Sequence, residues 1–143
     1  MRPRKGTRST PADYPFHLDL RVRFFETDAM GVVHHAAYLT YLETARVEYL
    51  RSLGRPYGEI RDRVGLDFAV VGIEVTYHAP LRFDEAFAVH AAIATASRSS
   101  FAIEYLVDRD GTKVLSGFSR HAVLEAATGR PVRIPDWLGQ IVA

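Results

Sequence analysis

The sequence contains no cysteine among its 143 residues. This absence excludes a disulfide framework, a thiolate nucleophile and a zinc site with cysteine ligands. The sequence also lacks an apolar run near the roughly 18 to 20 residues that a membrane-spanning helix needs. We therefore expect a soluble protein without membrane insertion, and the lack of cysteine is consistent with the cytoplasm.

A large excess of charge is missing as well. The 18 Lys and Arg residues nearly balance the 17 Asp and Glu residues, which leaves a net charge of +1. So small a charge argues against a broad nucleic-acid surface, because such binding depends on many phosphate contacts. Residues 1–13 are basic and contain no apolar signal segment, so they are predicted to form a disordered tail before a single domain at residues 14–143. Contact of this tail with nucleic acid or a membrane is a less favoured alternative.

Several familiar catalytic motifs are absent. There is no G-x-S-x-G turn, which argues against an α/β-hydrolase triad. Neither a Walker A loop nor a G-x-G-x-x-G fingerprint occurs, so the sequence gives no support for nucleotide hydrolysis or dinucleotide redox chemistry. Any reaction must therefore use carboxylates, histidines and backbone dipoles.

Hydrophobic periodicity predicts a chain of mixed α and β structure. Apolar and polar residues alternate over residues 16–24, which is typical of a strand with one buried face. Over residues 36–53 apolar residues recur at helical spacing, and Gly54 follows as a helix stop. A short helix is expected at residues 57–64. Four further runs rich in Val, Ile, Phe and Tyr predict strands at residues 68–77, 86–96, 100–107 and 113–124.

Short turns join these later strands. Turn residues at 79–80, 98–99 and 110–111 predict three consecutive antiparallel connections, and so a meander of the four later strands. One helix with one apolar stripe must cover one face of the sheet. The expected fold is therefore α+β, with a curved five-stranded antiparallel sheet wrapped around one long central helix. Trp137, near the C-terminal end, is expected to pack on this body.

Asp28 is the first candidate for chemistry. It lies between the end of the first strand and the start of the helix, close to Gly31. An aspartate beside a glycine most often forms an Asx-turn or a cap. A carboxylate near the free N–H groups of a helix start could equally act as a nucleophile or as a general base on water.

His34 and His35 stand at the entrance of the predicted helix. Side chains of adjacent residues are expected to point apart, and no further potential ligand lies at a spacing typical of a metal site. No metal site is therefore expected. A positioning or hydrogen-bonding role for these histidines is favoured instead.

Charged residues on the helix and the sheet give weaker signals. Glu43 and Arg46 are three apart on the helix, a spacing that usually indicates a side-chain pair, although Glu43 could orient water if it lines a cavity. Arg82, Arg98 and Arg120 either meet phosphates at the sheet edge or are solvated surface residues.

Residues 25–38, FETDAMGVVHHAAY, closely resemble the signature of the hotdog-fold acyl-CoA thioesterases of the 4-hydroxybenzoyl-CoA thioesterase type, including the branch associated with the Tol-Pal cluster. A weaker resemblance continues through residues 41–46 and 77–84, so that it covers nearly everything after the tail. The chain departs from the usual pattern at Glu26, where many relatives have Asp, and at Ala37, where Asn is frequent.

The resemblance implies roles for single residues. Asp28 aligns with the catalytic carboxylate, and His35 with the residue whose backbone N–H polarises the thioester carbonyl, with a further contribution from the His35 side chain. Asp67 and Phe68 are implied to line the acyl pocket of a partner chain. The implied substrate-binding residues are Gly31, Val33, Tyr38, Glu43, Asp67, Phe68 and Arg98.

The resemblance also implies an activity, which is hydrolysis of acyl-CoA to a free acid and CoA in the cytoplasm. Coenzyme A would be part of the substrate, with no separate cofactor and no metal. A homodimer, or a homotetramer, is implied, with each site at a subunit interface and no nucleic-acid partner. A non-catalytic acyl-thioester binding protein and a hotdog dehydratase are the alternatives, and the presence of Asp28 favours the hydrolase.

Overall fold

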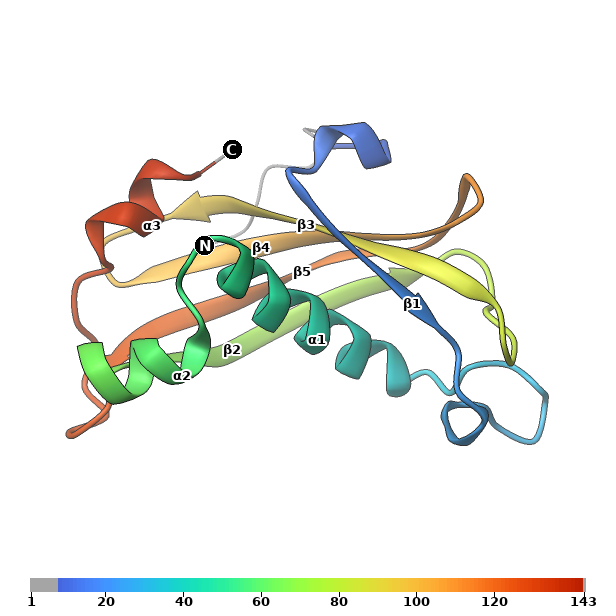
Figure 1. Cartoon of the computed structure of the whole chain (residues 1–143), viewed down its shortest axis with the longest axis horizontal. Coiled ribbons are helices and arrows are strands. Elements are labelled where there is room, and N and C mark those ends of the chain that lie inside the picture. Colours follow the sequence, from blue (N-terminus) through green and yellow to red (C-terminus); the bar gives the residue numbers. More distant parts are fainter. Residues whose placement is uncertain (1–7, 143) are drawn as a thin grey trace.

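The structure is a computed structural model that describes residues 8–142. Figure 1 shows one long helix, α1 at Ala37–Ser52, lying across one face of a five-stranded antiparallel sheet. The expected α+β architecture is therefore confirmed. The strands are β1 (Phe16–Arg21), β2 (Leu66–Tyr77), β3 (Ala86–Ala96), β4 (Ser100–Arg109) and β5 (Thr112–Glu125).

Short helical segments complete the described chain. In Figure 1 the start of α1 and the loop before it lie at one end of the sheet, and α2 and α3 lie at the other end. None of the helices within residues 8–142 is long and apolar enough to cross a membrane. The short segments are the 3-10 turns Pro11–Asp13 and Phe24–Glu26, helix α2 at Tyr57–Glu59 with the π-helical turn Ile60–Val64, and helix α3 at Asp136–Gln140.

The order of strands across the sheet is β1-β3-β4-β5-β2. Strands β3, β4 and β5 form the predicted meander, but the predicted pairing of β2 with β3 is wrong. Strand β1 occupies the edge of β3, with Phe16 opposite Ala91, and β2 pairs with the far side of β5, with Tyr77 opposite Leu115. The connection at residues 78–85 therefore runs from β2, at one edge of the sheet, past β5 and β4 to β3. The turn residues at 79–80 do not reveal such a crossing.

The first strand is shorter than the alternation predicts, because it ends at Arg21 instead of residue 24. The side chains of Phe24 and Phe25 are 76% and 75% exposed, so they do not belong to a buried face. The Glu26 carboxylate accepts the backbone N–H of Arg23 at 2.7 Å and pulls the chain into a 3-10 turn. A hydrogen bond of this kind, between residues three apart, favours a turn over an extended strand. The alternation of apolar and polar residues gives no indication of it.

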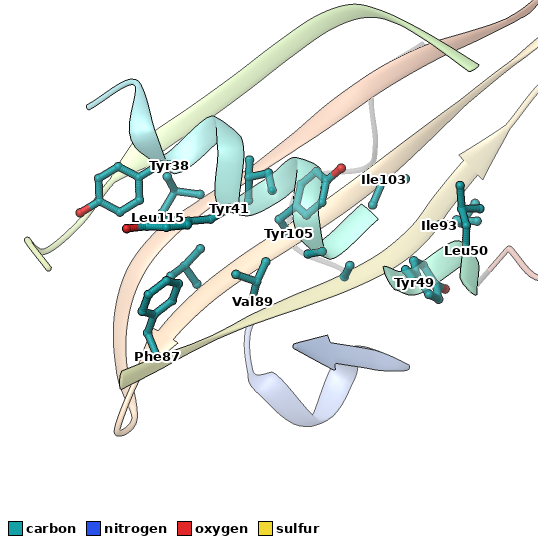
Figure 2. Close-up of a cluster of buried hydrophobic side chains, with 14 of the residues drawn as sticks. Tyr38, Tyr41, Tyr49, Leu50, Phe87, Val89, Ile93, Ile103, Tyr105 and Leu115 are labelled. Carbon is teal, nitrogen blue, oxygen red and sulfur yellow. The ribbon is translucent and has the colours of Figure 1, made fainter. Parts of the chain in front are cut away.

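Helix α1 supplies one wall of the core. Its stop at Gly54 is confirmed, because the glycine takes a left-handed φ of +72°. Leu39 lies on the predicted apolar stripe but is exposed. Figure 2 shows Tyr38, Tyr41 and Tyr49 of α1 among side chains of the sheet. The labelled sheet residues are Phe87, Val89 and Ile93 of β3, Ile103 and Tyr105 of β4, and Leu115 of β5.

The two ends of the described chain pack on this body. Trp137 packs against the core beside Phe68, as predicted. Residues 8–13 were expected in a disordered tail, but they hold a 3-10 turn, and the Arg8 guanidinium contacts the Glu104 carboxylate at 3.3 Å. The rest of that prediction, for residues 1–7, lies outside the described residues.

Candidate active site

The loop between β1 and α1 folds back on itself around Asp28. The Asp28 N–H donates to the Val32 carbonyl at 2.9 Å, and the Gly31 N–H donates to the Asp28 carbonyl at 3.0 Å. Gly31 has a φ of +78°, the left-handed conformation that glycine adopts without strain. This tight turn presents Asp28 at a fixed position before the helix.

The Asp28 carboxylate takes part in the turn. Its Oδ1 accepts the Met30 N–H at 2.9 Å, which is the expected Asx-turn. Its Oδ2 makes no hydrogen bond within residues 8–142. The structural and the chemical interpretations are therefore compatible, because one oxygen holds the loop and the other remains available.

The loop is anchored on both sides. The Val33 N–H donates to the Leu81 carbonyl at 2.8 Å, and the His34 N–H donates to the Glu26 carbonyl at 2.8 Å. These bonds attach the loop to residues 78–85 and to the 3-10 turn that follows β1. The segment that leads into α1 is thus held from two directions.

The His35 backbone N–H lies directly before the start of α1. Within the described chain its N–H donates to no backbone or side-chain acceptor, although the neighbouring N–H groups of His34 and Ala36 are both bonded. The His35 carbonyl accepts the Tyr77 hydroxyl at 2.7 Å. An unpaired N–H directly before a helix start, at the positive end of the helix dipole, is a candidate donor to a developing oxyanion.

The two histidine rings do not point apart, contrary to the prediction. The ring centroids of His34 and His35 lie 4.2 Å from each other. The His34 Nδ1 accepts the Ala36 N–H at 3.1 Å, and this bond turns the ring back over the helix start, beside its neighbour. Among residues 8–142, no group of three or more His, Cys, Asp or Glu side chains is placed to hold a metal ion.

A shallow hollow of about 310 Å³ opens beside His35. Three of the predicted site residues meet there, since Val33, His35 and Tyr38 all line it. The Tyr38 hydroxyl accepts the Leu81 N–H at 3.2 Å, so this ring also fixes the wall of the hollow. The remaining lining residues are Tyr77, His78, Ala79 and Pro80.

A second cavity of about 310 Å³ lies between α1 and the sheet, nearer the end of the helix. It brings together the predicted residues Glu43 and Phe68. Its walls are mostly apolar or aromatic, with Arg46 as the cationic member. The full lining is Glu43, Arg46, Val47, Leu50, Tyr57, Phe68, Val70 and Phe101.

Asp28 and three other predicted residues line neither hollow. Gly31 lies in the exposed turn, and Asp67 faces the Tyr57 hydroxyl at 3.4 Å and the Arg61 guanidinium at 3.7 Å. Arg98 is exposed in the turn between β3 and β4. Its backbone carbonyl accepts the Ile134 N–H at 2.8 Å. Within one chain, the structure does not bring these residues to Asp28.

Glu26 is a residue whose importance the sequence reasoning missed. It is 4% exposed, and its carboxylate accepts the Tyr41 hydroxyl at 2.8 Å and the Arg23 guanidinium at 2.9 Å. Burial alone would raise the pKa of Glu26, but the hydrogen bonds from Arg23 and Tyr41 outweigh it and hold the pKa below its ordinary value. Its place in the signature, two residues before Asp28, was the available signal.

A buried polar chain beneath the second cavity was also missed. The Arg46 guanidinium donates to the Tyr105 hydroxyl at 3.4 Å, and that hydroxyl is bonded to Ser119 at 2.7 Å. Ser119 is bonded in turn to Nε2 of His121 at 2.7 Å. Burial, with a smaller contribution from the Arg46 charge, lowers the pKa of His121 from 6.5 to about 3, so this histidine is neutral.

Comparison with known proteins agrees with this arrangement. The family model of the thioesterase-like superfamily matches residues 22–142. The chain belongs to this superfamily. The five-stranded antiparallel sheet with its central helix is accordingly a hotdog fold, and the protein is a thioesterase of this type.

Relatives cover most of the chain. The crystal structure of a hypothetical protein from Aquifex aeolicus is 36% identical, with a TM-score of 0.84, over 90% of this chain and 100% of that one. An acyl-CoA thioesterase of Haemophilus influenzae is 28% identical over 86% of this chain and 90% of its own length. A Thermus thermophilus thioesterase solved with coenzyme A and Zn is 28% identical, with a TM-score of 0.77, over 90% and 97% of the two chains.

Proposed function

We propose that the protein hydrolyses acyl-CoA thioesters to a free carboxylic acid and CoA, with Asp28 as base or nucleophile and the His35 N–H as oxyanion donor. One observation carries this proposal. A carboxylate oxygen of Asp28 and the N–H of His35, both without a partner in the described chain, stand on one anchored loop at the start of α1. The acyl-CoA thioesterase among its relatives supports the substrate class.

In the general-base route, the Asp28 carboxylate takes a proton from water while the water oxygen attacks the thioester carbon. The carbonyl oxygen gains negative charge and accepts the His35 N–H. The C–S bond then breaks, and the sulfur leaves with the proton as the thiol of CoA.

In the nucleophilic route, the Asp28 carboxylate attacks the thioester carbon and expels the CoA thiolate, which leaves a mixed anhydride. Water then cleaves the anhydride and restores the carboxylate. The His35 N–H serves the same oxyanion in both routes. No separate cofactor is proposed, because coenzyme A belongs to the substrate.

The catalytically competent assembly is proposed to be a homodimer. A homotetramer would consist of two such dimers. Within residues 8–142, strand β2 is a free edge of the sheet and carries exposed apolar side chains, with Val71 56% exposed and Ile73 39% exposed. A long apolar edge of this kind is suited to pairing with another strand. Two copies related by a twofold axis would pair their β2 edges antiparallel.

This pairing would complete the site. Phe68 stands near one end of β2 and Tyr77 at the other, so antiparallel pairing centred between Gly72 and Ile73 would bring Phe68 of one copy beside Tyr77 of the second. Asp67 and the cavity lined by Phe68 would then face the loop of Asp28 in the other copy. In this arrangement these residues would act across the interface, as the resemblance implies.

Thiol release from a panel of acyl-CoA thioesters tests the function. Asp28→Asn and Asp28→Ala should each lower kcat on the order of 10²-fold or more, because a group that acts in the chemistry is lost. Asp19→Asn, which changes an exposed aspartate of β1, is the matched control and should retain activity.

Two outcomes would contradict the proposal. If both Asp28 variants turn over like the wild type, the carboxylate has no part in the reaction. If the wild type binds acyl-CoA but cleaves none, the chain is a binding protein. The absence of a nucleic-acid partner and of membrane insertion, and the cytoplasmic location, stay predictions from the sequence.

A further inference from the structure

The unpaired N–H of His35 lies between N–H groups that are all bonded. The His34 N–H donates to the Glu26 carbonyl at 2.8 Å, and the Ala37 N–H donates to the His34 carbonyl at 2.9 Å. The Ala36 N–H donates to Nδ1 of the His34 ring at 3.1 Å. Two of these three acceptors belong to His34. This residue therefore holds the peptide unit that carries the His35 N–H and also the one that follows it.

The His34 ring takes the place of a helix cap. Ala36, the residue directly before α1, has no side chain that could accept a hydrogen bond from the helix start. Helices are usually capped by residues such as Ser, Thr and Asn, whose oxygens accept at any pH. An imidazole nitrogen accepts only while the ring is neutral. The cap of α1 therefore depends on the charge of His34.

Protonation of the His34 ring removes this acceptor. Nδ1 then carries an N–H of its own and faces the Ala36 N–H, so that two donors oppose each other. The resulting cation stands at the start of α1, where the helix dipole disfavours positive charge. Histidine is the side chain whose charge commonly changes between about pH 5 and pH 8. Acid therefore replaces the bond between His34 and Ala36 by a repulsive contact.

The titratable groups around the His34 ring lie on several segments. The loop carries the His35 ring, whose centroid is 4.2 Å away, and Asp28, whose Oδ1 accepts a backbone N–H. On the 3-10 turn after β1, the Glu26 carboxylate is already bonded within its own turn and to α1. In the segment after β2, His78 lines the hollow beside His35, and the first turn of α1 carries no acidic residue. Within residues 8–142, no carboxylate lies within 4.0 Å of His34 to compensate its charge.

We propose that His34 is a positioning residue for the hydrolysis, and that its neutral ring holds the His35 N–H in place to donate to the thioester oxygen. This inference rests on the proposed thioesterase function. The bond to Nδ1 holds the Ala36 end of a peptide unit whose other end is held by the Tyr77 hydroxyl. It also occupies the Ala36 N–H, which would otherwise compete for the same oxygen. Protonation of the ring therefore slows hydrolysis without any change at Asp28.

His34→Asn and His34→Ala test the ring in the full-length protein. The asparagine side chain offers an oxygen near the position of Nδ1, whereas alanine has no acceptor. At about pH 8, His34→Ala should lower kcat for acyl-CoA about 10-fold with a smaller change in KM, because the donor is loosened but not removed. His34→Asn should stay within about 3-fold of the wild type. His17→Ala, at an exposed histidine of β1, is the control and should leave kcat unchanged.

A pH profile separates positioning from a merely structural role. Between about pH 8 and pH 5, kcat of the wild type should fall toward that of His34→Ala. His34→Asn should lose less, because its cap does not titrate. Acid losses that arise at Asp28 are shared by all three proteins and cancel when the proteins are compared. Absorbance of the thioester follows the reaction at each pH, since thiol reagents themselves respond to pH.

Two kinetic results would overturn the inference. If His34→Asn is as slow as His34→Ala while both unfold at the temperature of the wild type, the acceptor has no part in catalysis. If His34→Asn loses as much activity in acid as the wild type, the charge of the ring is not the cause of the loss.

NMR of the isotope-labelled protein tests the bond without any substrate. At about pH 8, Nδ1 of His34 should be unprotonated, and the Ala36 amide should exchange about 10-fold more slowly than in His34→Ala. This protection, corrected for the intrinsic exchange rate, should vanish as the pH falls to about 5. A proton on Nδ1, or equal exchange in the two proteins, would overturn the inference even if a variant is too unstable for kinetics.

The outcomes also separate the role of His34 from the function on which it rests. If the wild type cleaves none of the acyl-CoA panel, the proposed function fails, whichever nitrogen of His34 carries the proton. If the wild type and both His34 variants cleave the panel with the same kcat at every pH, the role of His34 fails and the thioesterase stands.

Discussion

The hydroxyl of Tyr77 donates a hydrogen bond of 2.7 Å to the carbonyl of His35. These residues are 42 positions apart, one at the end of the edge strand β2 and the other in the last turn before α1. The bond holds the peptide unit that directly follows the unpaired His35 N–H. The end of β2 therefore positions the proposed oxyanion donor, although Tyr77 is not part of the loop.

Replacing Tyr77 by Phe tests this relationship. Tyr77→Phe keeps the ring that packs against Tyr38 but removes the bond to His35. We expect kcat for acyl-CoA hydrolysis to fall about 10-fold with a smaller change in KM, because an imprecise donor is felt most in the transition state. Tyr14→Phe, on the opposite edge of the sheet, is the control. An unchanged kcat would show that the bond does not position the donor.

His121 should make the fold sensitive to acid. Its pKa is lowered by burial to about 3 in the folded chain, so between about pH 6.5 and pH 3 the unfolded chain binds a proton that the folded chain does not. Stability from this residue is complete above about pH 6.5 and is lost as pH falls. Between about pH 7 and pH 4.5 the loss should be on the order of 2 kcal/mol.

Urea unfolding of the wild type and His121→Gln at the two pH values measures this contribution. The variant should start from a lower free energy of unfolding at about pH 7, because a packed ring is lost, yet decline less on acidification. Equal declines in the two proteins would show that His121 is not the acid-sensitive group.

Tyr41 should stabilise the loop through Glu26. Tyr41→Phe removes one hydrogen bond from a buried carboxylate and should lower the free energy of unfolding by about 1–3 kcal/mol near neutral pH. Since Glu26 has a lowered pKa, its stabilisation is present above its ordinary pKa and is lost in acid, so the difference between the two proteins should shrink there. A difference that is constant with pH would point to packing alone.

Much of the fold could be predicted from the sequence because its signals are local. A run of strand-favouring residues marks strand β3 at its observed bounds, and helical spacing with Gly54 marks α1 to within one residue. Apolar alternation fails at residues 22–24, where the hydrogen bond from the Arg23 N–H to the Glu26 carboxylate replaces the expected strand by a turn. It also fails where a distant partner decides, as in the pairing of β2 with β5.

In the candidate site, too, some features follow from local sequence and others from contacts between distant residues. By itself the sequence determined that an acid, a tight turn and a helix start stand next to one another, because covalent spacing fixes Asp28, Gly31 and His35 on one loop. Only the tertiary structure decided which groups hold that loop and which remain free. Tyr77 and the chain beneath Arg46 act through contacts between residues far apart in sequence, and no local pattern encodes a contact that folding alone creates.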